Sequence, residues 1–449
     1  MSRRKVLELF EKNRSYMEER ITSGIEQHRK GGATLLLKNE LGEPVTNAKV
    51  FIKQKKHEFK YGANLFMLDE METKEKNDRY KQYMASFGNM ATLPFYWNTL
   101  EPEQGKTRYG KDSERIYRRP PIDLCMEFCE ANGIEPREHA LAYDFFFPEW
   151  LRGKSDYEVK QALSKRFREV AERYGDKITT IEVTNETFWG LEKAVTDFYN
   201  HNDFVEWCFK EAEKYFGANQ LVINETQSNA WVDGFGRNRG KYYMQIERAL
   251  SKGARIDAIG FQFHMFHKKE AEYERTRLYY DPLFLYQILD RYADFGLPLQ
   301  ITEVTIPAYS NDAEDEEIQA EIIKILYSIW FSHPNVEQII YWNLVDGYAH
   351  VGNPNEVARS QGNMTEGENQ FYGGLVRFDL TPKPAYHTVK NLFEKQWHTE
   401  ETLNTDEGGS AFFRGFYGTY DVEIELNGKR IVKEIDLHKN GRSTFELVI

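Results

Sequence analysis

The pattern of apolar and polar positions divides the chain into short strand-like runs and longer helical stretches. Between residues 58 and 398 the two alternate, and in the helical stretches apolar residues recur every three or four positions. Eight runs have the composition of strands: 60–66, 88–95, 135–143, 177–186, 219–225, 256–264, 298–304 and 336–343. Strands that alternate with helices in this way favour an α/β protein with a parallel sheet closed into a (β/α)8 TIM barrel over an open doubly wound sheet.

The two ends of the chain have other patterns. Residues 1–57 begin with an amphipathic helix and then alternate around a Leu-Gly turn, which predicts a β-hairpin. Residues 399–449 alternate again and contain an Asn-Gly turn, which predicts a small C-terminal β module. We therefore expect an N-terminal helix and β-hairpin extension (1–57), the barrel (58–398) and a C-terminal β module (399–449).

The composition limits the classes of partner that the protein could bind. The net charge is −12 and there is no basic block, so we expect neither a nucleic acid nor an anionic membrane as partner. The three cysteines imply no disulfide framework. The first residues lack the continuous apolar segment of a signal peptide, and no run of apolar residues is long enough to span a membrane. The chain as given is expected to be cytoplasmic, or secreted if a leader was removed, and the pattern leaves its oligomeric state open.

In a barrel of parallel strands, the side chains at the C-terminal strand ends meet at one mouth, where the chemistry of such proteins is found. The predicted strands place these polar or aromatic residues there: His139, Asn185, Glu186, Gln262, His264, Glu303, Trp342 and Asn343. Two carboxylates from opposite sides of one mouth, with amides and imidazoles between them, are what hydrolysis of a glycosidic bond requires. A single glutamate at a strand end is more often a solvated charge or a helix cap, so the prediction rests on the whole group.

Other chemistries find less support in the sequence. His264 and His267 could suggest a metal, but no further His or Cys follows at ligand spacing, so we expect no metal and no cofactor. His264 alone could equally be a hydrogen-bonded core histidine. No serine or cysteine lies in a G-x-S-x-G nucleophile elbow, which argues against a Ser-His-Asp or Cys-His mechanism.

Several segments, taken in order, resemble glycoside hydrolase family 10, the endo-β-1,4-xylanase family. They are "WNTLEPEQGKTRY" (97–109), "HALAYDFFFPEWL" (139–151), "IEVTNE" (181–186), "IDAIGFQFH" (256–264), "ITEV" (301–304) and "YWNLVD" (341–346). The resemblance extends from about residue 57 to residue 392 and leaves the N-terminal helix and the C-terminal tail outside. It implies a retaining double displacement in which Glu186 is the general acid/base and Glu303 is the nucleophile.

The same resemblance implies how a carbohydrate substrate is held. Asn185 would hydrogen-bond the sugar 2-hydroxyl, and Trp342 would form an apolar wall. His139, Gln262 and His264 would line the subsite where cleavage occurs.

Departures from the family pattern fall on sugar contacts. Thr92, Leu93 and Tyr96 stand in place of the polar residues that grip the next glycone sugar. Tyr143 and Asp144 replace a Trp-His pair, and we assign both to substrate binding.

Two further replacements lie at Thr305, where the family usually has Asp, and at His350, where it has a second Trp. We therefore expect the catalysis to be kept and sugar recognition to differ. Three functions remain open. The first is an endo-1,4-β-xylanase-like hydrolase of plant-type polysaccharide or oligosaccharide. The second is an exo-acting or hexose-tolerant β-glycosidase on imported oligosaccharides. The third is a non-catalytic carbohydrate-binding barrel, which would need neither Glu186 nor Glu303.

Overall fold

The protein is built around a closed barrel of eight parallel strands, in the order β10-β3-β4-β5-β6-β7-β8-β9. The structure is a computed structural model and describes residues 2–188, 196–231, 237–351 and 361–449. The strands are β3 (Lys60–Asn64), β4 (Met90–Pro94), β5 (Glu135–His139), β6 (Thr180–Asn185), β7 (Gln220–Glu225), β8 (Ala258–His264), β9 (Leu299–Thr305) and β10 (Val336–Tyr341). Each overlaps one of the eight predicted runs, so the predicted (β/α)8 barrel is confirmed.

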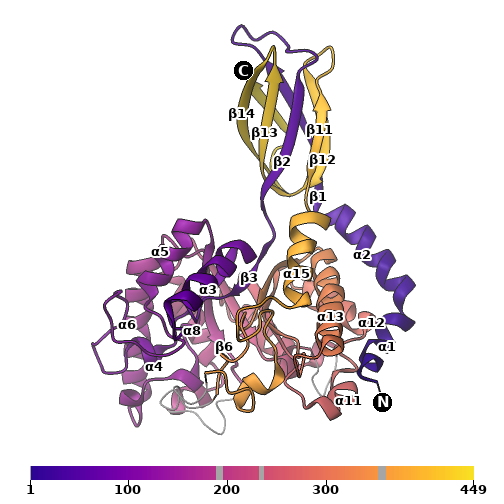
Figure 1. Cartoon of the computed structure of the whole chain (residues 1–449). Helices are drawn as coiled ribbons and strands as arrows, with labels where there is room; N and C mark the ends of the chain where they lie inside the picture. The colour runs from indigo at the N-terminus through magenta and orange to yellow at the C-terminus, as the bar shows by residue number, and fades with distance from the viewer. Residues whose placement is uncertain (1, 189–195, 232–236, 352–360) are drawn as a thin grey trace.

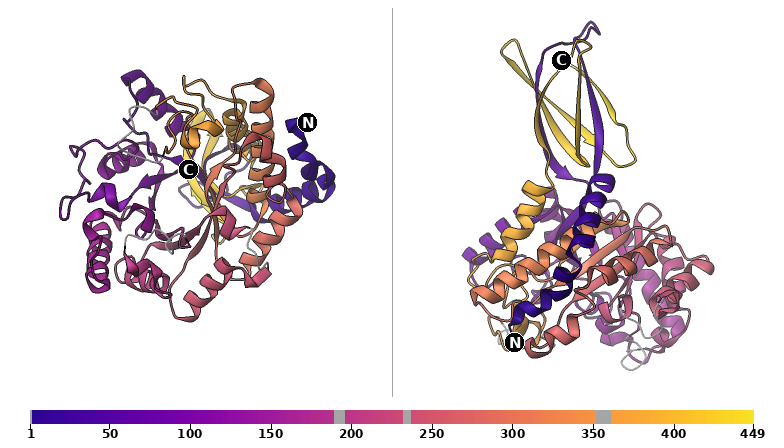
Figure 2. Two further views of the ribbon diagram at one scale, coloured as in Figure 1. Left: turned by 90° about the horizontal axis from the view of Figure 1, so that it is seen from below. Right: turned by 90° about the vertical axis from the view of Figure 1, so that its right-hand side faces the viewer.

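In the described part of the chain, one long α-helix follows each barrel strand, and these helices form a ring outside the barrel (Figure 2). They are α3 (Lys74–Phe87), α5 (Ile122–Asn132), α6 (Asp156–Tyr174), α8 (Phe204–Glu213), α10 (Lys241–Ser251), α12 (Pro282–Ala293), α13 (Ala313–Ser332) and α15 (Pro384–Asn391). Helix α6 shows why the sequence folds this way locally. Ser155 and Glu158 form a capping box at its start, and the residues Val159, Leu163 and Phe167 at helical spacing are buried against the barrel.

The N-terminal segment lies along the side of the barrel as α1 (Glu8–Lys12) and α2 (Arg14–His28), as the right-hand view of Figure 2 shows. Its residues Phe10, Met17 and Ile25 are buried in the barrel's hydrophobic core cluster. Helix α2 approaches α13 so closely that a Cβ on Gly24 would lie 2.4 Å from the backbone oxygen of Ser332. Glycine is therefore required for this contact.

The prediction of an N-terminal hairpin is wrong. Strands β1 (Lys30–Lys38) and β2 (Lys49–His57) lie in different sheets, with the orders β12-β1-β15 and β11-β2-β13-β14. The chain does turn back after β1, and the amide of Val45 donates to the carbonyl of Leu37 at 2.9 Å. Beyond this turn, however, each strand pairs with C-terminal strands, because a two-stranded hairpin would leave the apolar side chains of both strands exposed.

The N-terminal and C-terminal strands together form one β-sandwich. Its C-terminal strands are β11 (Glu400–Asn404), β12 (Ser410–Phe416), β13 (Gly418–Leu426), β14 (Lys429–Leu437) and β15 (Thr444–Val448). Residues that include Leu35, Ile52, Phe413 and Val422 pack between the two sheets as a separate hydrophobic core. The N-terminal extension and the C-terminal module, which the sequence predicts as separate units, thus share one hydrophobic core.

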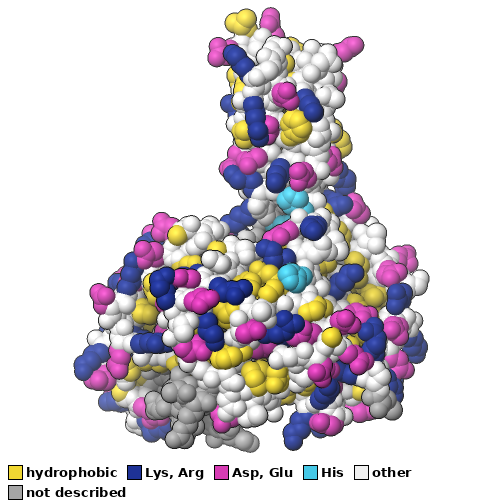
Figure 3. Space-filling model, in the orientation of Figure 1, with side chains coloured by type: hydrophobic (Ala, Val, Ile, Leu, Met, Phe, Trp, Pro, Cys, Tyr) yellow, Lys and Arg dark blue, Asp and Glu magenta, His cyan; other side chains and the backbone are white. Residues whose placement is uncertain are grey.

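The sandwich stands on the barrel face opposite the catalytic mouth expected from the sequence (Figure 1). The end of β2 at His57 leads directly into the start of β3 at Lys60, so the sandwich adjoins the N-terminal ends of the barrel strands. On the face shown in Figure 3, acidic and basic side chains are interspersed over both barrel and sandwich. None of the described helices has the length and apolar character needed to cross a bilayer.

Candidate active site

A cavity of about 360 Å³ lies at the C-terminal ends of the barrel strands. Its lining brings together these residues predicted from sequence: His139, Tyr143, Asn185, Glu186, Gln262, His264, Glu303 and Trp342. A larger hollow of about 860 Å³ lies on the outer surface beside α5 and α6, but it contains none of them. The cavity at the barrel mouth is therefore the candidate active site.

Glu186 directly follows β6 and extends into this cavity. Its backbone has φ of 52°, which is unusual for a residue other than glycine and occurs often at functional sites. Its carboxylate accepts hydrogen bonds from Gln262 Nε2 and from the Tyr143 hydroxyl, both at 2.8 Å. Burial, together with the negative charge of Glu303, raises the pKa of Glu186 to about 8. Glu186 therefore holds its proton at neutral pH, as a general acid must.

Glu303 lies near the end of β9, and its side chain is almost fully buried. Asn224 Nδ2 donates to its Oε1 at 3.1 Å, and His264 Nε2 lies 3.2 Å from its Oε2. Burial raises the pKa of Glu303 to about 7, while the nearby His139 opposes this rise. Because this pKa lies below that of Glu186, Glu303 is the first of the two to lose its proton as the pH rises.

These two pKa values predict a bell-shaped pH profile. The reactive form has Glu303 ionised and Glu186 protonated, so kcat/KM should be maximal between about pH 7 and pH 8. It should fall at lower pH as Glu303 gains a proton and at higher pH as Glu186 loses one. Initial rates on an aryl glycoside between pH 4 and pH 10 would test this, and a maximum near pH 5 would contradict it.

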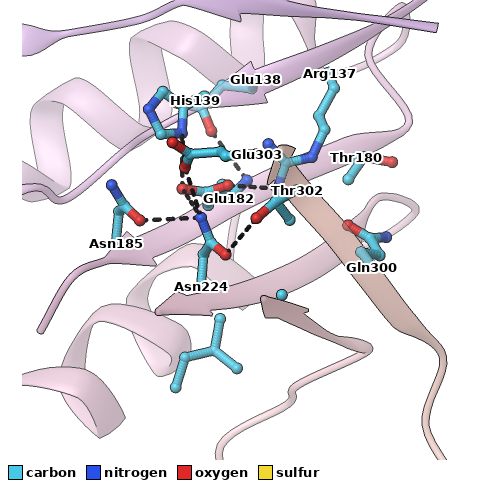
Figure 4. A network of polar contacts seen from close by, with 12 residues as sticks. Arg137, Glu138, His139, Thr180, Glu182, Asn185, Asn224, Gln300, Thr302 and Glu303 are labelled. Atoms are coloured by element: carbon cyan, nitrogen blue, oxygen red, sulfur yellow. Dashed lines mark hydrogen bonds and ion pairs between the residues drawn. The ribbon is translucent and has the colours of Figure 1, made fainter. Parts of the chain in front are cut away.

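Amide side chains form a network around the two carboxylates, and Figure 4 shows its part at Asn185, Asn224 and Glu303. Asn224, at the end of β7, donates to Asn185 Oδ1 at 3.0 Å as well as to Glu303, and Gln262 donates to Asn185 Oδ1 at 3.2 Å. The oxygen of Asn185 is thus occupied, whereas its buried Nδ2 has no hydrogen-bond partner in the described structure. A buried donor without a partner in a substrate cavity is available to a ligand oxygen, as expected for a contact to a sugar hydroxyl.

A buried ion pair between Glu182 and Arg137 supports His139. Glu182 on β6 pairs with Arg137 and accepts from His139 Nδ1 at 2.8 Å, while His139 Nε2 lies 3.0 Å from the Tyr96 hydroxyl. Burial acts to raise the pKa of Glu182, but the Arg137 guanidinium and the hydrogen bond from His139 outweigh it and the pKa lies below its usual value. Glu182 therefore stays ionised and orients His139.

His139, Glu182 and Glu303 also present possible metal-ligand atoms within 4.8 Å of one another. The Arg137 guanidinium already neutralises Glu182, and the Asn224 amide already donates to Glu182 and Glu303. A cation at this point would have to displace these donors, so the geometry does not fit a metal site.

His264 and Thr305 form a second support for the Glu303 carboxylate. Thr305 Oγ1 lies 3.0 Å from His264 Nδ1, and burial lowers the pKa of His264 to about 4. The imidazole is therefore neutral, with the threonine hydroxyl donating to Nδ1 and Nε2–H donating to Glu303. A neutral donor stabilises the carboxylate less than an imidazolium would, in keeping with the raised pKa of Glu303.

Replacing Thr305 by Asp is expected to move the acidic limb of the pH profile. A carboxylate beside Nδ1 would favour the charged form of His264, which would in turn lower the pKa of Glu303 by about 1 unit. The acidic limb of kcat/KM should shift to lower pH by the same amount. Thr305→Asn has a similar size without the charge and should leave that limb in place; an equal shift in both variants would contradict the electrostatic explanation.

Trp342 and Asp144 differ in their relation to the cavity. The Trp342 ring packs against Phe66, with ring centroids 5.1 Å apart, and against His139 at 5.4 Å, so it forms an apolar wall. Asp144 is buried and is not among the described residues that line the cavity. It begins a turn of 3-10 helix, Asp144–Phe146, and this change of backbone direction separates it from Tyr143.

Several residues of the site were not predicted from the sequence. Asn224 ends an apolar run, so the rule that selected Asn185 could also have selected it. Glu182 lies inside a strand, where a carboxylate gives no sign of facing a catalytic centre. Arg118 and Arg119 line the cavity from a loop with no periodic pattern, and only the structure places them there.

Comparison with known proteins agrees with this fold. Endo-1,4-beta-xylanase B of Thermotoga neapolitana is 23% identical over 313 residues, which are 67% of this chain and 78% of that protein. Anti-sigma-I factor RsgI6 of Acetivibrio thermocellus is 24% identical over 419 residues, 90% of this chain and 46% of its own length. Endo-1,4-beta-xylanase 1 of Arabidopsis thaliana is 24% identical over 365 residues, 80% of this chain and 32% of its own. The chain thus spans less than half of the last two proteins.

A solved structure has the same barrel. Xylanase 10B from Thermotoga petrophila RKU-1, in complex with xylobiose, superposes with a TM-score of 0.57 at 22% identity, and the match covers 76% of this chain and 95% of that one. The family model described as glycosyl hydrolase family 10 matches residues 60–392, which is most of the chain. The chain therefore belongs to glycosyl hydrolase family 10.

Proposed function

We propose that the protein is a retaining β-glycoside hydrolase with Glu186 as general acid/base and Glu303 as nucleophile. The observation that supports this best is the difference in environment between two carboxylates on one cavity. Glu186 has the higher pKa and reaches into the cavity. Glu303 has the lower pKa and is fixed by hydrogen bonds from Asn224 and His264. Pairs of groups whose pKa values differ in this way mark acid and nucleophile roles.

In the first step, an oxygen of Glu303 forms a bond to the anomeric carbon as the bond to the leaving oxygen breaks. The electron pair of that bond goes to the leaving oxygen, which takes the proton of Glu186. The ester that forms removes the negative charge of Glu303, and the pKa of Glu186 falls because this charge helped to raise it. Glu186 can then accept a proton from the water that cleaves the ester.

For the substrate, a β-1,4-linked xylan-type polysaccharide or oligosaccharide is the first candidate. Relatives of this chain are named endo-1,4-beta-xylanases, and a solved relative with the same barrel holds xylobiose. A second candidate is an exo-acting or hexose-tolerant β-glycosidase, with a cytoplasmic location and imported oligosaccharides. It is favoured by Tyr143 and His350, which line the cavity where the family has tryptophans.

A product-resolved screen over aryl glycosides and plant polysaccharides tests both candidates. Mixed oligosaccharides released from xylan would indicate endo action, and single sugars from chain ends would indicate exo action. Proton NMR of the first product gives the stereochemistry: a β-anomer supports double displacement, and an α-anomer would exclude it. Failure to hydrolyse any substrate, with sugar still bound, would support a non-catalytic carbohydrate-binding barrel.

A further inference from the structure

Two consecutive arginines line the candidate active site, and nothing in the double displacement requires them. Arg118 and Arg119 are 5% and 8% exposed, respectively, and both border the cavity that contains Glu186 and Glu303. Arginines this deeply buried normally pair with a carboxylate. Across the described residues, neither guanidinium forms an ion pair.

Their hydrogen bonds go to backbone oxygens instead. Arg118 donates from Nη1 to the carbonyl of Tyr348, and Arg119 donates from Nη1 to the carbonyl of Arg118 at 2.8 Å. The Nε atoms of both are buried and have no hydrogen-bond partner in the described structure. Each guanidinium therefore keeps an unused Nε donor, and no carboxylate of the described residues lies within ion-pair distance of it, although Glu368 is close enough to act on Arg119 electrostatically.

The backbone conformation allows the side chains of both arginines to reach the same cavity. Neighbouring residues in extended chain point in opposite directions, but Arg118 has φ of 59°, in the left-handed region. Arg119 precedes Pro120 and Pro121, which restrict the backbone after it. A left-handed conformation is strained for a residue other than glycine, and such conformations concentrate at ligand sites.

The surrounding rings hold Arg119 in one position. Its guanidinium carbon lies 4.0 Å from the centroid of the Tyr96 ring and 5.3 Å from that of Phe146. Tyr96 in turn hydrogen-bonds His139, so the arginines lie on the Tyr96 side of the catalytic carboxylates. A planar guanidinium fixed on an aromatic face presents its remaining donors in a set direction.

The other titratable groups that line this part of the cavity form no ion pair with the arginines. Glu368 lines the same cavity, but its carboxylate accepts from Asn343 Nδ2 at 2.9 Å and forms no ion pair with either arginine. His350 also lines the cavity; burial and the two arginines lower its pKa to about 4, so it is neutral. The two guanidiniums are therefore the cations that face a ligand on this side.

We propose that the sugar at the point of cleavage carries a carboxylate on its Tyr96 side, so that the substrate is a β-linked hexuronide whose carboxylate is held by Arg118 and Arg119. This proposal rests on the proposed glycoside hydrolase function and specifies its substrate class. Guanidinium and carboxylate match in charge and can share two parallel hydrogen bonds. A neutral sugar would leave the unused donors unpaired, and a dianionic phosphate would place more negative charge close to Glu303 and Glu368.

Three aryl glycosides that differ only at one carbon test the proposal: 4-nitrophenyl β-D-glucuronide, the corresponding β-D-glucoside and its 6-phosphate. We expect kcat/KM to be highest for the glucuronide. Arg119→Met and Arg118→Met should each lower it about tenfold to hundredfold for the glucuronide and much less for the glucoside. Arg119→Lys keeps the charge without the planar fork and should recover part of the loss.

Controls separate recognition from folding and from catalysis. Arg152→Met removes the same charge at an exposed position and should leave kcat/KM unchanged for both the glucuronide and the glucoside. Thermal melting shows whether each variant is folded. Calorimetry of glucuronide binding to Glu303→Gln, with and without each arginine substitution, reports on the arginines without turnover.

Equal losses of kcat/KM on glucuronide and glucoside in both arginine variants, or a preference of the wild type for the glucoside or the phosphate, would overturn the proposal. In those cases hydrolysis would persist and the proposed function would stand. Glucuronide binding that depends on the arginines without hydrolysis by the wild type would instead overturn the proposed function.

Discussion

Glu303→Gln is expected to lower kcat by about 10⁵-fold, because without this carboxylate no glycosyl-enzyme ester can form. The fold should tolerate the change. Asn224 can still donate to the amide oxygen, and the neutral His264 can change tautomer so that Nε2 accepts from the new amide group. Steady-state rates on an aryl glycoside measure the loss. Added azide should restore turnover in Glu303→Ala by attacking the sugar directly, with an α-glycosyl azide as product.

Glu337 provides a matched control for this variant. It is a barrel glutamate on β10 that accepts from Gln300 and Gln220, both at 2.8 Å, near the N-terminal ends of the strands. Glu337→Gln should keep kcat within about twofold, since it leaves the cavity unchanged. Unchanged turnover in Glu303→Gln would remove the double displacement from consideration.

Glu186→Gln is expected to lower kcat/KM by about 10²–10⁴-fold on substrates with a poor leaving group. The loss should be much smaller for a dinitrophenyl glycoside, because this leaving group departs without protonation. In that case the second step becomes slow, and the glycosyl-enzyme should accumulate. The descending limb of the pH profile above about pH 8 should disappear, since it reports the ionisation of Glu186.

The leaving-group comparison distinguishes an acid/base from a residue that only positions substrate. A positioning residue would give the same loss with every leaving group and would leave the shape of the pH profile intact. Azide should accelerate the second step in Glu186→Gln and give a β-glycosyl azide, the opposite anomer to that from Glu303→Ala. The same anomer from both variants would contradict the assigned roles.

The predicted strands and helices of the barrel agree with the structure because their signals are local. Each strand is a short apolar run buried on both faces, and each helix shows apolar residues at helical spacing along one face. The hairpin prediction failed at β1 and β2 for the opposite reason. Alternation shows that a strand has one buried face, but it does not show which strand it pairs with, and the partners of β1 and β2 lie over 300 residues later in the chain.

For the candidate site, sequence reasoning succeeded where parallel strands impose the geometry. The ends of β5, β6, β8 and β9 must meet at one mouth, so His139, Glu186, Gln262 and Glu303 could be grouped without distances. Asp144 showed the limit of this rule, because β5 already ends at His139 and Asp144 begins a separate 3-10 turn. Glu182 and Asn224 were missed because their importance lies in hydrogen bonds to residues on neighbouring strands.

The sequence by itself determined the barrel and the family and placed Glu186 and Glu303 at one barrel mouth, because periodicity and strand-end position are properties of short segments. Only the tertiary structure decided the order of their pKa values, since that order depends on burial and on which donors and charges surround each carboxylate. It alone decided that the two chain ends share one sandwich core. It also placed Arg118 and Arg119 on the substrate cavity, because a loop is positioned by contacts with the rest of the molecule and not by its own pattern.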